Sequence, residues 1–269
     1  MLRPNWSAIV VLTAGVLLAS QAAAQTAISA EGVIESKSGG FQYPDGTVQT
    51  SAAVPMGACP TLDPSDEMIW VGGVCIDKYE ASIWDAPVGG NQINPSAPGG
   101  ICNLNGQDCD SIWARSVAGV EPAHYVTWFQ AQAALANSGK RLPTNAEWQM
   151  AVRGTPDDTG EGTTPCNTRE ESLQDTGAEP GCVSDFGAFD MVGNVWEWVA
   201  DWAPAAATLC PGWLLSDDQL CLAGPSPGAL LRGGDSFLRS PAGPFTVLGY
   251  FPESSGPSWS AYFGFRGAR

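Results

Sequence analysis

Hydrophobic and polar positions alternate over short stretches along most of this chain, and a helical period appears in two places. The first predicted helix is Trp128–Asn137, where apolar residues recur at positions i, i+3 and i+7 and so share one face. Thr127 and Gln130 have the spacing of a capping box at its start, and Gly139 follows its end. These residues predict an amphipathic helix with both ends defined.

The second predicted helix is Asn145–Arg153. Thr144 and Glu147 form another capping box at its start, and Gly154 follows its end. Its buried face is expected to comprise Trp148, Ala151 and Val152. Arg141 lies in the loop between the helices, where we expect it to pair with a carboxylate and brace the loop rather than bind a ligand.

Apolar alternation predicts strands before and after the helices. Met68–Tyr79 has a Gly-Gly break and predicts a hairpin, while Leu230–Gly234 predicts a strand that runs into a glycine turn, and Phe263–Arg266 a final strand. Glycine and proline, at 32 and 21 residues, indicate many turns and little regular structure. The chain is therefore expected to be an α+β protein with two main helices, short antiparallel strands and much irregular loop.

The segment Phe186–Trp202 differs because acidic residues stand among its apolar ones. After the Gly193-Asn194 turn, an extended run would place Glu197 on one face with Val195 and Val199, opposite two tryptophans. A carboxylate in that position is costly to bury unless something pairs with it.

Asp190 stands on the other side of the same turn. A tight turn would let the carboxylates of Asp190 and Glu197 and the turn carbonyls converge on one point. Such an oxygen-rich cage suits Ca²⁺, which takes six to eight oxygen ligands. The alternative is an ordinary tight turn with a solvated Asp190 and a salt-bridged Glu197.

This segment also resembles the signature of the formylglycine-generating enzyme, or sulfatase-modifying factor, superfamily. Three further segments resemble family motifs and occur in the family's order: Gly139–Gly154, Leu230–Phe237 and Tyr262–Arg269. The resemblance covers Asp66 to Arg269 and implies a C-type-lectin-like fold. It also implies that the Met68–Tyr79 hairpin opens the domain and packs near the C-terminal strand.

The resemblance implies two calcium sites with carboxylate, amide and carbonyl ligands. In the better matched site the ligands are the side chains of Asp190 and Glu197 and the carbonyls of Gly193 and Val195. In the other they are Asn167, Thr168 and Glu179, where relatives usually have Asp in place of Glu179. Ca²⁺ is therefore expected as a structural ion.

Catalysis by this family depends on residues that are missing here. By the resemblance, formylglycine-generating enzymes oxidise a substrate cysteine with molecular oxygen, using copper(I) on two thiols a few residues beyond the Arg-Gly-Gly motif; thiolates suit Cu(I). The corresponding segment, Asp235–Tyr250, contains no cysteine. We therefore expect no copper and no formylglycine generation, and we assign no catalytic residue.

A second branch of the superfamily uses a non-haem iron held by histidines, and the single histidine here, His124, excludes a multi-histidine zinc or iron site within this chain. We expect His124 to be a packed or surface side chain.

The arginines of the two C-terminal motifs are expected to form structural salt bridges. Arg232 and Arg266 are the arginines, and Asp201, Asp235 and Glu253 the candidate partners.

The net charge of −16, with only 15% charged residues, makes nucleic acid and anionic membranes unexpected partners, because little basic charge is available to neutralise phosphates.

Residues 1–24 have the features of a signal peptide: Arg3, the apolar run Ala8–Ala19, and small residues at 22–24. A membrane anchor is the competing interpretation, although the run is short for a span. Export to a periplasm or beyond, with no membrane span after cleavage, is expected.

Residues 25–57 are interpreted as an N-terminal extension or stalk, because Ile28–Gln49 contains strand and turn patterns but few apolar positions. The alternative is a partly disordered leader. The main domain is expected over residues 58–269.

The eight cysteines are an even number, which favours disulfides in an oxidising compartment. Spacing suggests four local pairs, each worth about 2–4 kcal/mol. These pairs are Cys59–Cys75, Cys102–Cys109, Cys166–Cys182 and Cys210–Cys221. A cysteine metal site is not expected, because the chain contains no Cys-x-x-Cys motif.

Two functions from different classes remain. The first is a non-catalytic binding or structural module, stabilised by calcium and disulfides, that presents loops to a protein or glycan ligand. The second is an exported oxidase of the same superfamily that uses other residues or a different metal.

Overall fold

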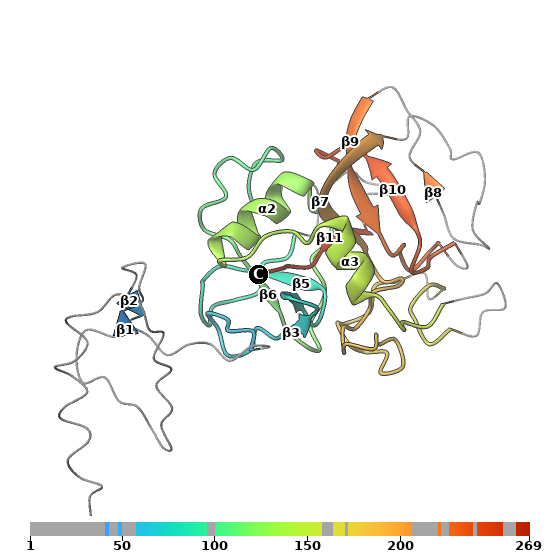
Figure 1. The fold of residues 1–269 in the computed structure, drawn as a ribbon. Coiled ribbons are helices and arrows are strands. Elements are labelled where there is room, and N and C mark those ends of the chain that lie inside the picture. The colour runs from blue at the N-terminus through green and yellow to red at the C-terminus, as the bar shows by residue number, and fades with distance from the viewer. Residues whose placement is uncertain are drawn as a thin grey trace, which may run out of the picture. The chain divides into compact units, whose positions relative to one another are not determined.

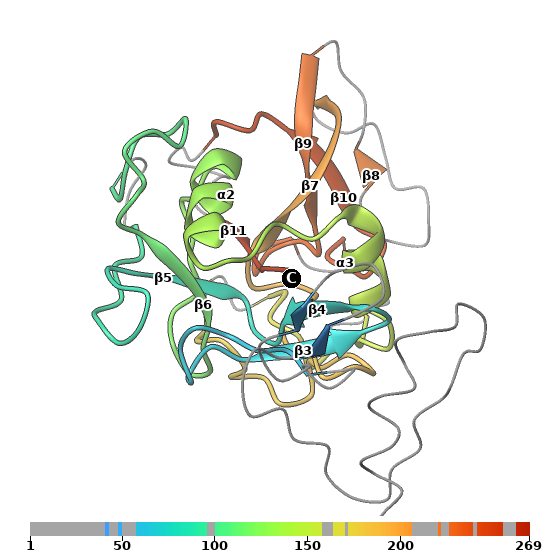
Figure 2. The ribbon, with the colours of Figure 1, turned by 60° about the vertical axis from the view of Figure 1, so that its left-hand side comes forward.

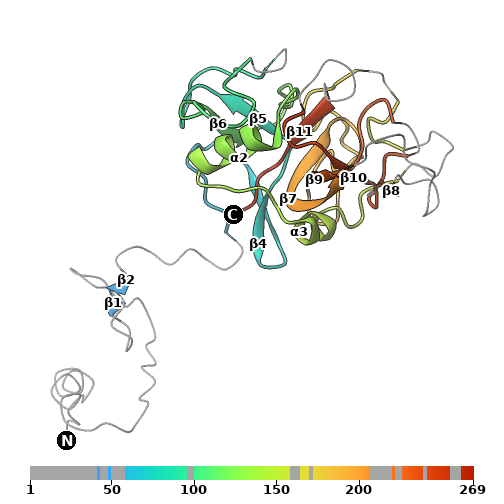
Figure 3. The same ribbon diagram turned by 90° about the horizontal axis from the view of Figure 1, so that it is seen from above.

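The computed structural model describes residues 41–42, 48–49, 58–95, 100–157, 164–169, 172–205, 220–221, 226–238, 241–254 and 262–269. The chain divides into two units, Met1–Ala53 and Val54–Arg269. In the first unit, β1 (Phe41–Gln42) pairs antiparallel with β2 (Val48–Gln49) (Figure 3). The predicted signal peptide lies outside the described residues.

The second unit is built around a five-stranded sheet of order β11-β7-β9-β10-β8 (Figure 1). Its strands are β7 (Trp196–Ala205), β8 (Leu220–Cys221), β9 (Ser226–Arg232), β10 (Val247–Tyr250) and β11 (Phe263–Phe265). β7, β9 and β10 are antiparallel neighbours, whereas β11 runs parallel to β7 and β8 parallel to β10. The sheet is thus mixed, and not antiparallel throughout as expected.

Two hairpin-like ladders accompany the sheet. β3 (Met68–Val71) and β4 (Val74–Asp77) pair antiparallel around the predicted Gly-Gly turn, and β5 (Ala81–Trp84) pairs with β6 (Trp113–Ser116). The chain end runs back to β4, where Arg269 and Cys75 exchange backbone hydrogen bonds of 2.8 and 3.0 Å. The hairpin therefore packs against the C-terminal segment, as expected.

Both predicted helices are present. α2 (Trp128–Asn137) has the predicted bounds, and α3 (Asn145–Ala151) ends two residues before the predicted Arg153. Both capping boxes form, at Thr127 and at Thr144. α2 packs against β6, and α3 packs against β7 and β3 (Figure 2). No helix among the described residues is both long and apolar enough to span a bilayer.

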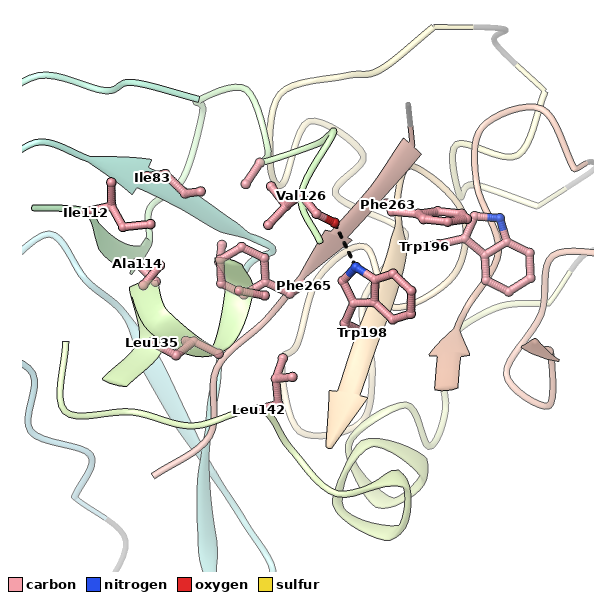
Figure 4. Close-up of a cluster of buried hydrophobic side chains, with 14 of the residues drawn as sticks. Ile83, Ile112, Ala114, Val126, Leu135, Leu142, Trp196, Trp198, Phe263 and Phe265 are labelled. Atoms are coloured by element: carbon pink, nitrogen blue, oxygen red, sulfur yellow. Dashed lines mark hydrogen bonds between the residues drawn. The ribbon is translucent and has the colours of Figure 1, made fainter. Parts of the chain in front are cut away.

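The core gathers around the tryptophans of β7 (Figure 4). Trp198 packs edge-on against Phe263 with ring centroids 5.3 Å apart, and its Nε1 donates to the carbonyl of Val126 at 2.8 Å. The strand register shifts between Trp198 and Trp202, where Ala200 N donates to Pro143 O instead. The first part of β7, Trp196–Val199, is buried on both faces, whereas the Trp202 ring beyond the shift is exposed.

Three of the four predicted disulfides are present: Cys59–Cys75, Cys102–Cys109 and Cys166–Cys182. The predicted partner of Cys221, Cys210, lies outside the described residues. For these three bridges, spacing within loops rich in turn-forming residues predicted the pairing correctly.

Candidate metal centre

Glu197, the second residue of β7, is 1% exposed and forms the centre of a buried polar cluster. Arg266 Nε donates to both of its carboxylate oxygens at 2.8 Å, and Trp148 Nε1 donates to Oε2 at 2.6 Å. Parallel pairing of β11 with β7 brings Arg266 there, because Phe265 lies opposite Trp198. Glu197 therefore forms a salt bridge with Arg266, as the alternative interpretation of this residue predicted.

The prediction that Arg266 pairs with Asp201, Asp235 or Glu253 is wrong, because its carboxylate partner is Glu197. Asp201 accepts from the backbone of Asn145, and Asp235 accepts from the Trp196 indole. Sequence patterns could not supply the register of a parallel strand pair, which decides this contact.

Arg232 and Arg141 brace the surroundings of α3. Arg232 stacks over the Trp148 ring at 4.5 Å and donates to the side chains of Asn145 and Gln149. Arg141 donates to both carboxylate oxygens of Glu147 at 2.7 Å, the loop-bracing role that we expected.

Asp190 is buried, at 5% exposure, so the alternative of a solvated side chain is wrong. Its Oδ2 accepts from the backbone N–H of Gly177 at 2.6 Å. Burial raises the pKa of Asp190 to about 6, and the charges of Glu197 and Glu179 act in the same direction. Its backbone has φ of +56°, a conformation uncommon outside glycine.

Glu80 is a third buried carboxylate, which the sequence analysis missed. It is fully buried between β4 and β5 and accepts from Asn194 Nδ2 at 2.6 Å and from Val195 N at 3.1 Å. Burial raises its pKa well above the usual range, and the negative charges of Asp190 and Glu197 raise it further. The available signal was weaker than at Glu197, because Asp77 and Lys78 precede Glu80 and only the following run, Ala81–Trp84, is largely apolar.

Asn194 joins the two predicted calcium sites. Its Nδ2 donates to Glu80, while its Oδ1 accepts from Asn167 Nδ2 at 2.9 Å. Its N–H donates to the Asn167 carbonyl at 2.8 Å. The contact is close because Gly193 has no side chain: a Cβ there would lie 2.3 Å from that same carbonyl. Asn167 and Thr168 of one predicted site therefore adjoin the Gly193-Asn194 turn of the other.

Two of the predicted ligand residues have a side-chain oxygen that is unpaired within the described part of the chain. Asn167 Oδ1 and Thr168 Oγ1 are buried and have no hydrogen-bond partner within the described part of the chain. Glu179 lies close enough to raise the pKa of Asp190 by charge repulsion. Unpaired buried oxygens are costly, so they mark a place where an ion or water would be stabilised.

Some of the predicted ligand residues could bind a hard cation such as Ca²⁺, and others are already held by protein groups. Glu80, Asp190 and Glu197 are buried beside one buried guanidinium, that of Arg266, so the cluster carries excess negative charge when all three acids are ionised. The carboxylate of Glu197 is already held by Arg266 and Trp148, which leaves Glu80 and Asp190 as the uncompensated acids. No group of three or more His, Cys, Asp or Glu side chains in the described ranges has the arrangement of a metal site.

Fold and site together define an α+β, disulfide-linked domain with a buried acidic centre at the junction of a glycine turn and β7, the longest strand. Residues 43–269 match the family model described as sulfatase-modifying factor enzyme 1-like domain. The chain belongs to that family.

Curated relatives match shorter parts. A formylglycine-generating enzyme of Thermomonospora curvata is 36% identical over an alignment of 141 residues, and the match covers 44% of this chain and 45% of the relative. The inactive C-alpha-formylglycine-generating enzyme 2 of Bos taurus is 36% identical over 104 residues, 32% and 34% of the two chains. A hercynine oxygenase of Mycolicibacterium smegmatis is 33% identical over 96 residues, 31% and 22%. This chain spans less than half the length of each of these relatives.

Among solved structures, the Major Tropism Determinant M1 variant superposes with a TM-score of 0.49 and 20% identity, over 77% of this chain and 53% of the other. The α+β class is confirmed by the strands and helices themselves. The C-type-lectin-like assignment remains a prediction.

Proposed function

We propose that this chain is an exported, non-catalytic binding or structural module of C-type-lectin-like architecture, stabilised by disulfides and Ca²⁺. One observation carries the proposal. The segment Asp235–Tyr250, which follows the Arg-Gly-Gly motif, contains no cysteine. The six cysteines whose pairing the structure describes are all in disulfides. The segment Asp235–Tyr250 itself therefore supplies no nucleophile and no soft ligand for copper, and Cys221, in the strand that pairs with β10, is expected to be in a disulfide with Cys210.

The buried acidic cluster supports the calcium part of the proposal. Glu80 and Asp190 are the carboxylates without a cation of their own, and Asn167 and Thr168 supply unpaired oxygens nearby. The carbonyls of Gly193 and Val195 and the Glu179 carboxylate would complete an oxygen-rich set. Glu197 would contribute indirectly, by fixing Arg266 and the turn. The ion would neutralise the cluster and hold it in place.

The surface supports the binding part. Phe237 and Phe245, both in the segment that lacks thiols, are 43% and 52% exposed. Exposed aromatic side chains favour contact with a partner. One relative is named as inactive, so loss of activity has a parallel among similar chains. A protein or glycan ligand is the partner that we propose.

A single preparation of the exported protein tests the proposal. It is incubated with Cu(I) and a cysteine-containing peptide, and oxygen consumption and aldehyde formation are measured. The formylglycine-generating enzyme of Thermomonospora curvata is the positive control. We expect consumption at the level of a copper-only blank. Copper-dependent oxidation of the peptide, or a redox metal at stoichiometric level by elemental analysis, would overturn the proposal in favour of the oxidase alternative.

A further inference from the structure

Aromatic rings and one carboxylate from distant parts of the chain meet beside the glycine turn that follows β9. Asp235 and Phe237 come from that turn, Trp196 begins β7, and Tyr262 immediately precedes β11. We call these four residues the Asp235 cluster. Figure 4 shows Trp196 of this group beside Phe263, the residue that follows Tyr262.

The carboxylate of Asp235 is fixed but not neutralised by its contacts. Its Oδ2 accepts from Trp196 Nε1 at 3.1 Å, and its Oδ1 accepts from the N–H of Phe237 at 2.9 Å. Both donors are neutral. At 4% exposure the group is largely out of water, and burial raises its pKa. Within the described residues, none of the ion pairs found includes Asp235. Burial makes the ionised form of this carboxylate costly, and a cation bound beside it would offset that cost.

The rings supply a surface that suits the same charge. Phe237 is 43% exposed, and its ring lies 4.9 Å from that of Tyr262 in an edge-on arrangement. The faces of aromatic rings are negative and attract ammonium groups, most strongly where water is excluded. Asp235 also raises the pKa of Tyr262, after the larger effect of burial, so the carboxylate acts on this ring.

Tyr125 adds a second observation. It has φ of +53°, which is an outlier for a bulky residue, and strain of this kind is enriched at functional sites. Its phenol is close enough to Tyr262 to influence the pKa of that residue. A strained tyrosine from one loop thus lies near the turn that carries the exposed phenylalanine and the buried carboxylate.

We propose that the Asp235 cluster binds an alkylammonium group, with Asp235 supplying the charge and Phe237 and Tyr262 the ring faces. This inference rests on the proposed function, because it specifies the ligand chemistry of a binding module. The shared chemistry occurs in free quaternary ammonium compounds and in lysine side chains of proteins, so the experiment includes a probe for each.

The test is a titration followed by NMR, using the ring-induced shift of the probe's methyl or methylene protons. The probes are choline and N-acetyl-lysine methylamide, and the matched neutral control is 3,3-dimethylbutan-1-ol, which has the shape of choline without its charge. Variants are Phe237→Leu and Asp235→Asn. Trp202→Leu is the control variant, because it removes a ring that is 47% exposed but lies six residues along β7 from Trp196, about 20 Å in an extended strand. Thermal melting checks that each variant folds.

We expect at least one cationic probe to bind saturably and the neutral isostere not to bind. Phe237→Leu should weaken binding about threefold to tenfold and Trp202→Leu should leave it unchanged. Asp235→Asn should weaken it more, and Phe237→Leu keeps the test decisive if that variant unfolds. Equal binding of choline and its isostere, no saturable binding of either cation, or an unchanged affinity in Phe237→Leu would overturn the inference. None of those results would change the outcome of the copper and oxygen test. The ligand inference and the proposed function can therefore be refuted independently of each other.

Discussion

Arg266 Nε lies 2.8 Å from both carboxylate oxygens of Glu197, and neither side chain is more than 1% exposed. The two residues are 69 positions apart and meet because β11 adds to β7 in parallel. Arg266 also donates to the carbonyls of Asp77 and Phe189, so one guanidinium ties the final strand to β4 and to the turn that carries Asp190.

Removing Arg266 should therefore destabilise the fold strongly. Arg266→Met leaves Glu197 buried without its charge partner, and such a loss costs about 3–5 kcal/mol of unfolding free energy. Urea denaturation with intact disulfides measures the difference. Arg141→Met is the matched control, because it breaks an arginine–glutamate pair whose arginine is 47% exposed, and it should cost about 1 kcal/mol or less. Equal losses in the two variants would contradict this account of the buried pair.

Metal-free stability should fall as pH rises through the range in which Asp190 ionises. The pKa of Asp190 is raised from 3.8 to about 6, so between these values the folded protein binds more protons than the unfolded chain. Unfolding free energy then decreases with pH, by up to about 3 kcal/mol for a shift of this size. The pKa of Glu80 is raised in the same direction, which extends the decrease to higher pH.

Melting temperatures from pH 4 to 8 in chelator measure this slope. Asp190→Asn is neutral throughout and keeps an acceptor for Gly177, so its curve should be flatter in this range. With saturating calcium the slope should diminish or reverse, because the ion favours the ionised acids. A wild-type curve that rises with pH in chelator would refute the assignment of Asp190 as a buried, uncompensated acid.

The elements that sequence predicted well are those decided by near neighbours. The capping boxes at Thr127 and Thr144 depend on residues three positions away, and both helices begin where these predict. Three disulfides follow from spacing within loops. By contrast, the hydrogen bond between Glu80 and Asn194 joins residues 114 positions apart, and the partner of Arg266 depends on strand register. No local pattern contains that information, so Glu80 was missed and Arg266 was assigned the wrong partners.

Calcium should stabilise the wild-type protein and should lose that effect when Asp190 is removed. An ion bound to the folded state alone adds about 2.7 kcal/mol at a concentration of 100 times its dissociation constant. We expect Asp190→Ala to lower the melting temperature in calcium buffer and to change it little in chelator.

Asp185→Ala is the control for this experiment, because it removes the same charge from a side chain that is 55% exposed and pairs with Arg153. Its response to calcium should match that of the wild type. If Asp190→Ala and Asp185→Ala lose stability equally in calcium and in chelator, general charge effects in a protein of net charge −16 would be the explanation, and not a metal site.

The Cys166–Cys182 disulfide should support the calcium centre as well as the fold. Cys166 directly precedes Asn167 and Thr168, whose unpaired oxygens adjoin the glycine turn, and Cys182 O accepts from the N–H of Asp190 at 3.1 Å. Replacing both cysteines with alanine should lower the unfolding free energy by about 3 kcal/mol and also reduce the stabilisation by calcium.

The matched control is the double alanine variant of Cys59 and Cys75, because both bridges span 16 residues and so constrain the unfolded chain equally. The control should lose stability but keep its calcium response, measured as the difference in melting temperature between calcium and chelator. If calcium raised the melting temperature of the two double variants equally, the Cys166–Cys182 disulfide would have no specific role in calcium binding.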